Sequence, residues 1–322
     1  MKKIISIFLA LFIITGILAG CRSGESSGAA RDKKLKIVAT IFPEYDWVKQ
    51  ILGDKAQDVE LTILLDSSAD LHSFQPTVDD IIKISTCDLF IYVGGESDRW
   101  AEDALKEVVN KDMTVLNLLD ILGDSVKEEE TVEGMQGKEE EEEPEFDEHV
   151  WLSLKNAQIF CAAIADALAK IDPGNAKAYA DNAAAYEARL AGLDGKYREA
   201  VDSAPVKTVL FGDRFPFRYL TDDYGLEYYA AFAGCSAETE ASFETIIFLA
   251  KKTDELGLKS ILQIETSDGS VPRAIRDNTA TKDQEILILN SLQSTSSDDI
   301  KNGVTYISVM EDNLAVLKEA LK

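Results

Sequence analysis

Residues 35–65 read LKIVATIFPEYDWVKQILGDKAQDVELTILL, and this stretch decides the fold class. Apolar residues dominate 35–41 and 59–65, and each of these segments has the length and composition of a buried β-strand. Between them, residues 45–52 follow Pro43 and have the pattern of a helix that ends at a glycine. A strand–helix–strand unit of this kind predicts a parallel sheet with helices on its faces.

The same alternation continues through the rest of the chain. We expect further strands at residues 89–93, 114–116, 208–211, 260–264 and 286–289, and further helices at residues 78–85, 100–110, 153–170, 243–256, from about 272, and 312–321. Between the two groups of strands, residues 175–201 form an Ala-rich run with Tyr and Leu near helical spacing. A helix of about 27 residues spans roughly 40 Å, which is long enough to connect two lobes.

We therefore predict an α/β fold in which two doubly wound parallel-sheet lobes are joined by one long helix. The N-terminal lobe is expected to cover residues 35–172, the linking helix residues 173–204 and the C-terminal lobe residues 205–322. Open sheets of this class bind ligands in loops at the carboxyl ends of their strands, so chemically active residues are expected in those loops.

The N-terminus has the features of a bacterial lipoprotein signal. Two lysines precede an apolar stretch, residues 4–18, that is too short for a lasting membrane span. Leu-Ala-Gly then leads directly to Cys21, which is the arrangement of a lipobox. We expect residues 1–20 to be removed, Cys21 to carry a lipid that anchors the protein outside the cytoplasm, and residues 21–34 to form a flexible tether. The alternative is an ordinary signal peptide with an incidental cysteine.

The chain is strongly acidic. Its formal net charge is −25, and loss of the two lysines in the signal peptide would take it to −27. Such a charge repels nucleic acid and anionic lipid and attracts cations. Residues 128–148 include five consecutive glutamates and almost no apolar residue, so we expect a disordered acidic loop there. At most, the glutamates would collect cations weakly, because a flexible run cannot fix a coordination geometry.

Three cysteines follow the lipobox: Cys87, Cys161 and Cys235. Their number is odd, and no two of them form a CxxC pair. A free cysteine behaves as a small apolar residue and is among the most frequently buried residue types. The favoured interpretation is therefore that all three are buried free thiols.

The chain has only two histidines, and neither lies on a periodic apolar face. His72 lies in the loop after the strand at 59–65, and His149 ends the acidic segment at the start of a helix. Neutral imidazole is a favoured zinc ligand, and carboxylates can complete the coordination shell. A lone loop histidine is usually a surface or capping residue, so spacing alone leaves the two interpretations evenly balanced.

A series of motifs occurs in a fixed order along the chain: HSFQPT at 72–77, DLFIYV at 88–93, HVWL at 149–152, YGL at 224–226, GVTYISVM at 303–310 and Asn313-Leu314. Behind a lipobox, these motifs resemble the zinc/manganese substrate-binding lipoproteins of ABC importers, the ZnuA/TroA-like group (cluster A-I). The resemblance runs from about Leu35 to the C-terminus.

The resemblance implies two lobes around a backbone helix, with a metal ion held in the cleft between them and passed to an ABC-importer permease. Carried over residue by residue, it makes His72 and His149 the metal ligands of the first lobe. Zn²⁺ is the favoured cargo, and Mn²⁺ is the alternative because the second half is rich in carboxylates. The acidic segment falls where several zinc-binding members carry a histidine-rich insertion. We expect a monomer that binds no nucleic acid.

The resemblance fails in the second lobe. Many family members have a histidine or glutamate about ten residues before the YGL motif, where this chain has Arg214, which cannot bind a cation. Asp213 is the nearest substitute. The family's aspartate near the last strand is also missing, because Asn290 stands in that region. Glu265 and Glu240 are further candidates, although an ordinary solvated or helix-capping role is favoured for each. We predict Asp213 as the second-lobe ligand, with Glu265 as the second choice.

Two other classes of function compete with this one. A metal hydrolase would need an open coordination position and a poised base, and the sequence has no HExxH, GxSxG or P-loop pattern. We therefore predict that the protein is not an enzyme. A surface adhesin with incidental metal affinity is the second rival, and it would not need His72 for its activity.

Overall fold

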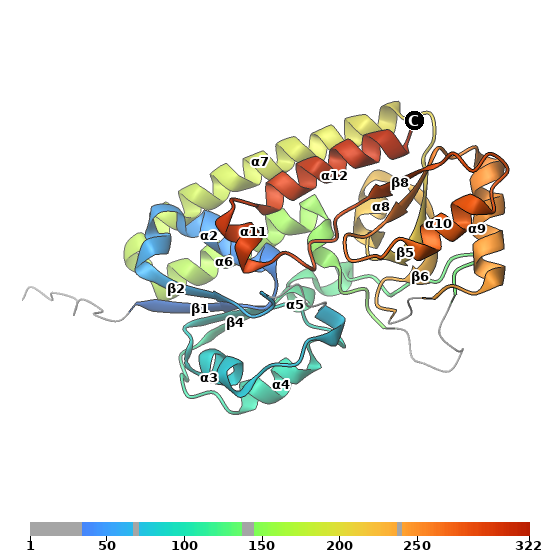
Figure 1. Ribbon diagram of the computed structural model, residues 1–322. Helices are drawn as coiled ribbons and strands as arrows, with labels where there is room; N and C mark the ends of the chain where they lie inside the picture. Colours follow the sequence, from blue (N-terminus) through green and yellow to red (C-terminus); the bar gives the residue numbers. More distant parts are fainter. Residues whose placement is uncertain (1–33, 67–70, 137–144, 237–239) are drawn as a thin grey trace, which may run out of the picture. The chain divides into compact units, whose positions relative to one another are not determined.

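Two four-stranded parallel sheets form the framework of the chain (Figure 1). The computed structural model describes residues 34–66, 71–136, 145–236 and 240–322. The predicted signal peptide, Cys21 and nearly all of the tether lie outside these described residues, as do the five consecutive glutamates at 139–143. Within the described part, no helix combines the length and the apolar character that a membrane crossing requires.

The first sheet has the strand order β2-β1-β3-β4, and all its neighbours are parallel. Its strands are β1 (Leu35–Ala39), β2 (Val59–Ile63), β3 (Leu89–Tyr92) and β4 (Thr114–Asn117). The helices of this lobe are α2 (Phe42–Leu52), α3 (Val78–Thr86), α4 (Arg99–Lys106) and α5 (Leu118–Leu122). Every residue of β3 is buried, as expected for a central strand covered on both faces.

The second sheet repeats this topology with the order β6-β5-β7-β8. Its strands are β5 (Thr208–Phe215), β6 (Glu227–Ala233), β7 (Ser260–Gln263) and β8 (Glu285–Ile288). Its helices are α8 (Arg218–Tyr224), α9 (Phe243–Leu256), α10 (Ser270–Asp277) and α11 (Ser297–Lys301). The predicted α/β class with two parallel-sheet lobes is confirmed. Strand β6 was not predicted, and β5 runs four residues beyond the predicted end at 211, with a register shift between Phe211 and Arg214.

Long helices connect the lobes. α6 (Leu154–Ile171) packs along α7 (Ala176–Ser203), which is the predicted linking helix, and the tyrosines and leucines that indicated it are buried. α12 (Tyr306–Ala320) leaves the second lobe and lies beside α7 (Figure 1). The Tyr197 hydroxyl donates to the Met310 carbonyl at 2.7 Å, and the Tyr306 amide donates to Asp46 Oδ2 at 2.9 Å. The C-terminal helix therefore ties the linking helix to the first lobe.

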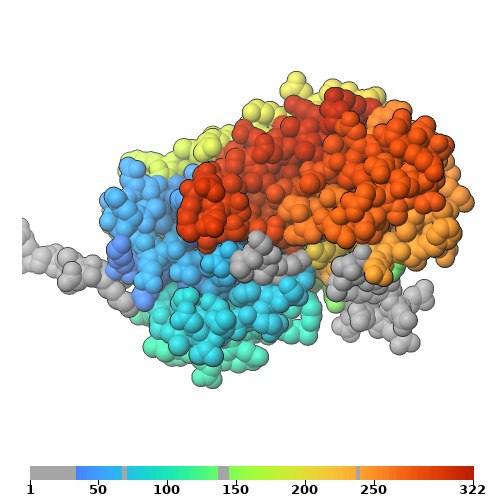
Figure 2. All heavy atoms as spheres, in the orientation of Figure 1, coloured from blue at the N-terminus to red at the C-terminus, as the bar shows by residue number. Residues whose placement is uncertain are grey.

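The core also connects the lobes close to His149. The Trp47 ring packs edge-on against Tyr306, with centroids 5.2 Å apart. The Tyr306 hydroxyl donates to the Trp151 carbonyl at 2.6 Å, and Trp151 Nε1 donates to the Ser291 carbonyl of the second lobe at 2.9 Å. At the surface, the Ser297 amide donates to the Asp66 carbonyl at 3.2 Å, and Figure 2 shows the red-orange atoms of α11 against blue atoms of the first lobe. Residues 35–322 accordingly group as a single unit.

The acidic segment differs from the expectation where it is described. We expected a disordered loop over residues 128–148, but Glu128 and Phe146 form an antiparallel bridge. The Gln136 amide donates to the Ala231 carbonyl at 2.9 Å, which adds this part of the segment to the open edge of β6. Arg218 pairs with Glu130 at 2.5 Å. Edge pairing and ion pairs thus compensate for the low apolar content that favoured disorder.

Candidate metal centre

His149 is held at the end of the acidic segment, just before the short 3₁₀ helix η4 (Val150–Leu152) that leads into α6. Its side chain is fully buried. Nδ1 lies 3.0 Å from Asp147 Oδ1, and the same oxygen accepts the His149 backbone N–H at 2.9 Å. Because an ionised carboxylate only accepts, the imidazole proton belongs on Nδ1. Nε2 then presents its lone pair, as in a metal-ligating histidine oriented by a carboxylate.

His72 has the same arrangement with different partners. It lies in the 3₁₀ turn η2 (Leu71–Ser73), with Nδ1 2.8 Å from Ser97 Oγ and 3.5 Å from Glu148 Oε2. The other oxygen of Glu148 accepts the Ser97 backbone N–H at 2.8 Å, so Ser97 and Glu148 hold each other beside the ring. Burial raises the pKa of Glu148 above its usual range. If the proton is on Nδ1, the ring can donate toward Ser97 Oγ and Glu148 Oε2, and the lone pair then lies on Nε2.

The two Nε2 atoms lie 3.2 Å apart. When both protons are on Nδ1, both Nε2 lone pairs face the space between the rings, where a cation can bind. Two nitrogens on a tetrahedral zinc, with Zn–N of about 2.0–2.1 Å, are separated by roughly 3.3 Å. The histidine pair therefore has the spacing that zinc requires, and the structure brings together the two ligands predicted for the first lobe.

A cysteine of the second lobe, Cys235, lies close to the two histidines. His72, His149 and Cys235 each offer one ligand atom, and these three atoms all lie within 4.8 Å of one another. Cys235 follows the end of β6 and is half-buried, whereas Cys87 and Cys161 are buried as predicted. The sequence interpretation of Cys235 as one more buried thiol is therefore corrected. Burial raises the pKa of the Cys235 thiol well above its usual range, and the charges of Glu129, Asp147 and Glu148 add to the shift.

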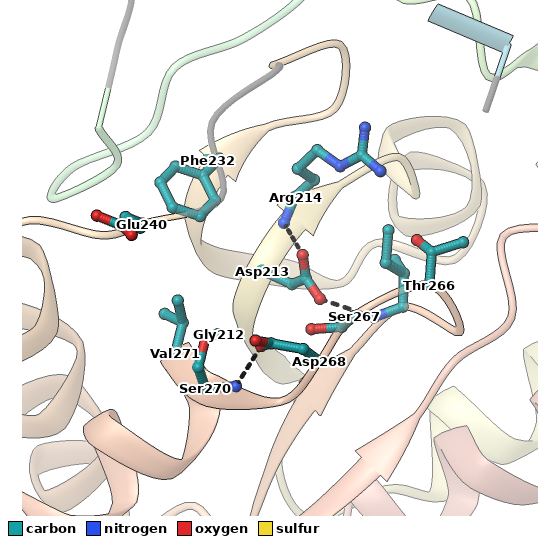
Figure 3. Close-up of a pocket in the computed structure, with 11 residues that line it drawn as sticks. Gly212, Asp213, Arg214, Phe232, Glu240, Thr266, Ser267, Asp268, Ser270 and Val271 are labelled. Carbon is teal, nitrogen blue, oxygen red and sulfur yellow. Dashed lines mark hydrogen bonds between the residues drawn. The ribbon is translucent and has the colours of Figure 1, made fainter. Parts of the chain in front are cut away.

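Asp213 lies apart from this cluster. It lines a pocket of about 470 Å³ in the second lobe, together with Arg214, Glu240 and Asp268 (Figure 3). Its Oδ1 accepts the Arg214 backbone N–H at 2.8 Å, and its Oδ2 accepts the Ile264 N–H at 3.3 Å. Asp213 belongs to β5, because this strand continues past the predicted loop boundary. Its assignment as a metal ligand stays a prediction.

Glu265 is engaged in a different way. Its Oε2 accepts the Ser291 N–H at 2.7 Å, and its Oε1 accepts the hydroxyls of Ser291 and Ser294 at 2.9 and 3.1 Å. The carboxylate thus orders the loop after β8, whose Ser291 carbonyl also receives the Trp151 N–H. Glu265 as a ligand likewise stays a prediction.

Comparison with known proteins gives a consistent result. The family model for the periplasmic component A of the zinc-uptake complex, ZnuA, matches residues 37–320. The high-affinity zinc uptake system protein ZnuA of Bacillus subtilis is 32% identical over 326 residues, covering 97% of both chains. The zinc-binding lipoprotein AdcA of Streptococcus pneumoniae is 31% identical over 320 residues, and this chain spans only 61% of its length.

Solved structures show the same similarity. The Zn(II)-bound ZnuA-like domain of Streptococcus pneumoniae AdcA has a TM-score of 0.69 and 28% identity, covering 90% of this chain and 99% of that one. The metal-dependent lipoprotein YcdH of Bacillus subtilis has a TM-score of 0.71 and 29% identity, covering 89% of this chain and 99% of that one.

Proposed function

Because this chain belongs to the ZnuA family of periplasmic zinc-uptake components, we propose that it captures zinc outside the cytoplasm and delivers it to the permease of an ABC importer. The family consists of solute-binding receptors, so the protein is a receptor and not an enzyme. Zinc is its cargo rather than a catalytic cofactor. The relatives and neighbouring structures named as zinc-binding or Zn(II)-bound favour zinc over manganese.

The spacing of 3.2 Å between His72 Nε2 and His149 Nε2 carries this proposal. In both rings, a hydrogen bond at Nδ1 fixes the orientation that points Nε2 toward the other ring. Neither ring therefore has to reorient when the ion binds. Neutral imidazoles need lose no proton to bind zinc, and the acidic surface of the chain attracts the cation.

We also propose that the mature protein is a monomer anchored through a lipid on Cys21. The name of the AdcA relative, a zinc-binding lipoprotein, supports the anchor. Several acyl chains hold a protein stably, whereas a single chain gives marginal attachment. Residues 21–34 then serve as a tether between the membrane and the two lobes.

Substitution of the histidines tests the proposed function. His72→Ala and His149→Ala should each weaken zinc binding by orders of magnitude, measured by titration against a competing chelator. Zinc should also raise the melting temperature of the wild type far more than that of either variant. Since the chain has no third histidine to serve as a control, the zinc-free melting temperature reports whether each variant is folded.

The same variants separate the importer role from an adhesin role. Cells that carry His72→Ala should lose growth under zinc limitation, because an importer subunit cannot work without its metal site. An adhesin would not need this residue. If the variant with both histidines replaced binds one zinc ion with wild-type affinity, the proposed site is wrong.

A further inference from the structure

We infer that Cys235 supplies a thiolate as the third zinc ligand, and that this sulfur makes the receptor selective for zinc over manganese. The inference rests on the proposed function, since it concerns the same ion. It differs from our sequence-based assignment, which looked for the second-lobe ligand among Asp213 and Glu265.

The distances are close to those of a zinc complex. With Zn–N of about 2.0–2.1 Å and Zn–S of about 2.3 Å, a tetrahedral ion places the sulfur roughly 3.5 Å from each nitrogen. The three ligand atoms already lie within 4.8 Å of one another. A shift of about 1 Å in the Cys235 side chain or its loop therefore completes a His₂Cys set. The fourth position is open to water or to a carboxylate.

The loop that carries Cys235 is shaped around His149. A Cβ on Gly234 would lie 3.1 Å from His149 Cε1 and 2.9 Å from the Phe215 carbonyl oxygen, so only glycine fits there without displacement. The Cys235 amide donates to Glu129 Oε1 at 2.8 Å, and the Ser236 amide donates to the Ala233 carbonyl at 3.2 Å. Backbone contacts thus hold the cysteine beside the imidazole.

Arg214 contributes to this loop from the position where the family resemblance led us to expect a histidine or glutamate. Its Nη1 donates to the Ser236 carbonyl at 3.5 Å. A cation cannot ligate zinc, but it can hold the segment that brings a different ligand. Arg214 thus contacts the segment that carries Cys235, although it cannot be a ligand itself.

The other two cysteines have surroundings unsuited to metal binding. Cys87 is buried with its sulfur 3.4 Å from the Met113 sulfur, and Cys161 is buried within α6. Cys235 is the one cysteine among the described residues that is partly exposed and has two imidazoles next to it. A cysteine that only fills space in the core needs no imidazoles next to it, so packing alone does not explain why Cys235 lies beside His72 and His149.

Two consequences follow for binding. His72 and His149 belong to the first lobe and Cys235 to the second, so an ion bound to all three favours the conformation in which the lobes are closed. The thiol gives up its proton to solvent as the Zn–S bond forms, and nothing is oxidised. Thiolate is a soft ligand that suits zinc, whereas manganese prefers carboxylate, carbonyl and water oxygens.

Alkylation of the wild-type chain tests the inference without any substitution. Because burial raises the pKa of this thiol and only the thiolate is alkylated, the reaction is run at alkaline pH. Under these conditions we expect iodoacetamide to label Cys235 in the zinc-free protein and one equivalent of zinc to slow this labelling, with labelled peptides identified by mass spectrometry. Cys87 and Cys161 should stay unlabelled until the protein unfolds, and so provide internal controls. Equal labelling of Cys235 with and without bound zinc would overturn the inference.

Cobalt and manganese give a direct readout of sulfur ligation. Co²⁺ bound to the wild type should show a thiolate-to-cobalt charge-transfer band that Cys235→Ser lacks, while Cys161→Ala keeps it. Cys235→Ser should also lose zinc affinity by more than the roughly 10- to 100-fold cost of removing an outer hydrogen-bond partner. Its zinc-to-manganese affinity ratio should fall in parallel.

The outcomes distinguish this inference from the proposed function. If the wild type binds no zinc, the proposed function fails. If the histidine variants lose zinc but Cys235→Ser keeps wild-type affinity and metal preference, and the charge-transfer band is absent from the wild type, only the role of Cys235 is refuted.

Discussion

Gly234 lies directly against the imidazole of His149, so that an added Cβ would be 3.1 Å from Cε1 and 3.2 Å from Nδ1 of the ring. This contact joins the loop after β6 in the second lobe to His149, a proposed metal ligand of the first lobe. Any side chain at residue 234 would displace the ring, the loop or both. The position of the ligand therefore depends on how closely the second lobe approaches.

Gly234→Ala should accordingly weaken zinc binding at least about tenfold, since a ligand displaced by a few tenths of an ångström no longer matches the tetrahedral geometry. The zinc-free stability should also fall, because the added Cβ would lie 2.9 Å from the backbone carbonyl oxygen of Phe215, which cannot move aside as a flexible side chain can. Titration and thermal melts measure the two effects. Gly192→Ala is the matched control: it lies in α7 with open space around its Cβ, and it should raise stability by about 1 kcal/mol without changing affinity.

Asp147→Asn tests whether the hydrogen bond behind His149 matters. The carboxylate accepts from Nδ1 and fixes the tautomer that leaves Nε2 free. An asparagine keeps the size but removes the charge, so zinc affinity should fall by about 10- to 100-fold. Asp80→Asn, in the capping box at the start of α3, is a control that should leave zinc affinity unchanged. Equal affinities for wild type and Asp147→Asn would show that the ring needs no carboxylate.

Asp213→Ala and Glu265→Ala test the predicted second-lobe carboxylate ligands. Both side chains accept hydrogen bonds from backbone amides, which would hold the carboxylates in place if they also bind the ion. If either is a ligand, its variant should bind zinc more weakly and close less, as seen by small-angle scattering. Asp268→Ala, in the same pocket as Asp213, controls for charge alone. Wild-type binding and closure in both variants would remove these two residues from the site.

The long linking helix could be predicted from the sequence because its signal is local, whereas the spacing of the two histidines left their role open and only the family resemblance assigned it. α7 has buried residues at helical spacing over 28 positions, and the histidines fall in loops next to regular elements. Strand β6 was missed for a physical reason. Its sequence, EYYAAFA, has two central alanines, which have weak strand propensity, and its tertiary partner β5 supplies the stability.

Missing β6 also meant missing Cys235, since the strand is what brings the loop to His149. No spacing rule connects a lone cysteine to histidines in another lobe. The end of β5 shows the opposite error. We placed it at residue 211 because the apolar run ends there, but the register shift lets β5 continue to Phe215, so Asp213 lies within the strand and its carboxylate accepts the Ile264 N–H.

Cys21→Ser tests the lipid anchor. The variant should be recovered in the soluble fraction after cell lysis or in the medium, whereas the wild type should stay with the membrane, because loss of the acyl chains removes the apolar attachment. Zinc affinity should not change, which shows that the receptor itself is intact. Recovery of the variant in the membrane fraction as abundantly as the wild type would contradict the anchor.

The buried carboxyl of Glu44 should make the stability of the folded protein depend on pH. Its carboxyl is fully buried, and this burial, together with the charge of Asp98, raises its pKa from 4.5 to about 8, although hydrogen bonds from Ile41 and Thr40 partly oppose the shift. Between these two values the folded protein keeps a proton that the unfolded chain releases. The free energy of unfolding should therefore fall as pH rises from about 4.5 to 8, by at most about 1.4 kcal/mol per pH unit, and level off above that.

Glu44→Gln should remove this contribution, because the amide resembles the protonated acid and keeps an oxygen that can accept the Thr40 and Ile41 amides, as Oε2 does at 2.8 and 3.2 Å. Urea titrations of the zinc-free protein should show a flatter profile for the variant, with a clear gain over wild type at pH 8 and little difference near pH 4.5. Glu44→Ala controls for the hydrogen bonds, since it should destabilise the protein at every pH. Parallel pH profiles for wild type and Glu44→Gln would mean that Glu44 is ionised in the folded protein at neutral pH.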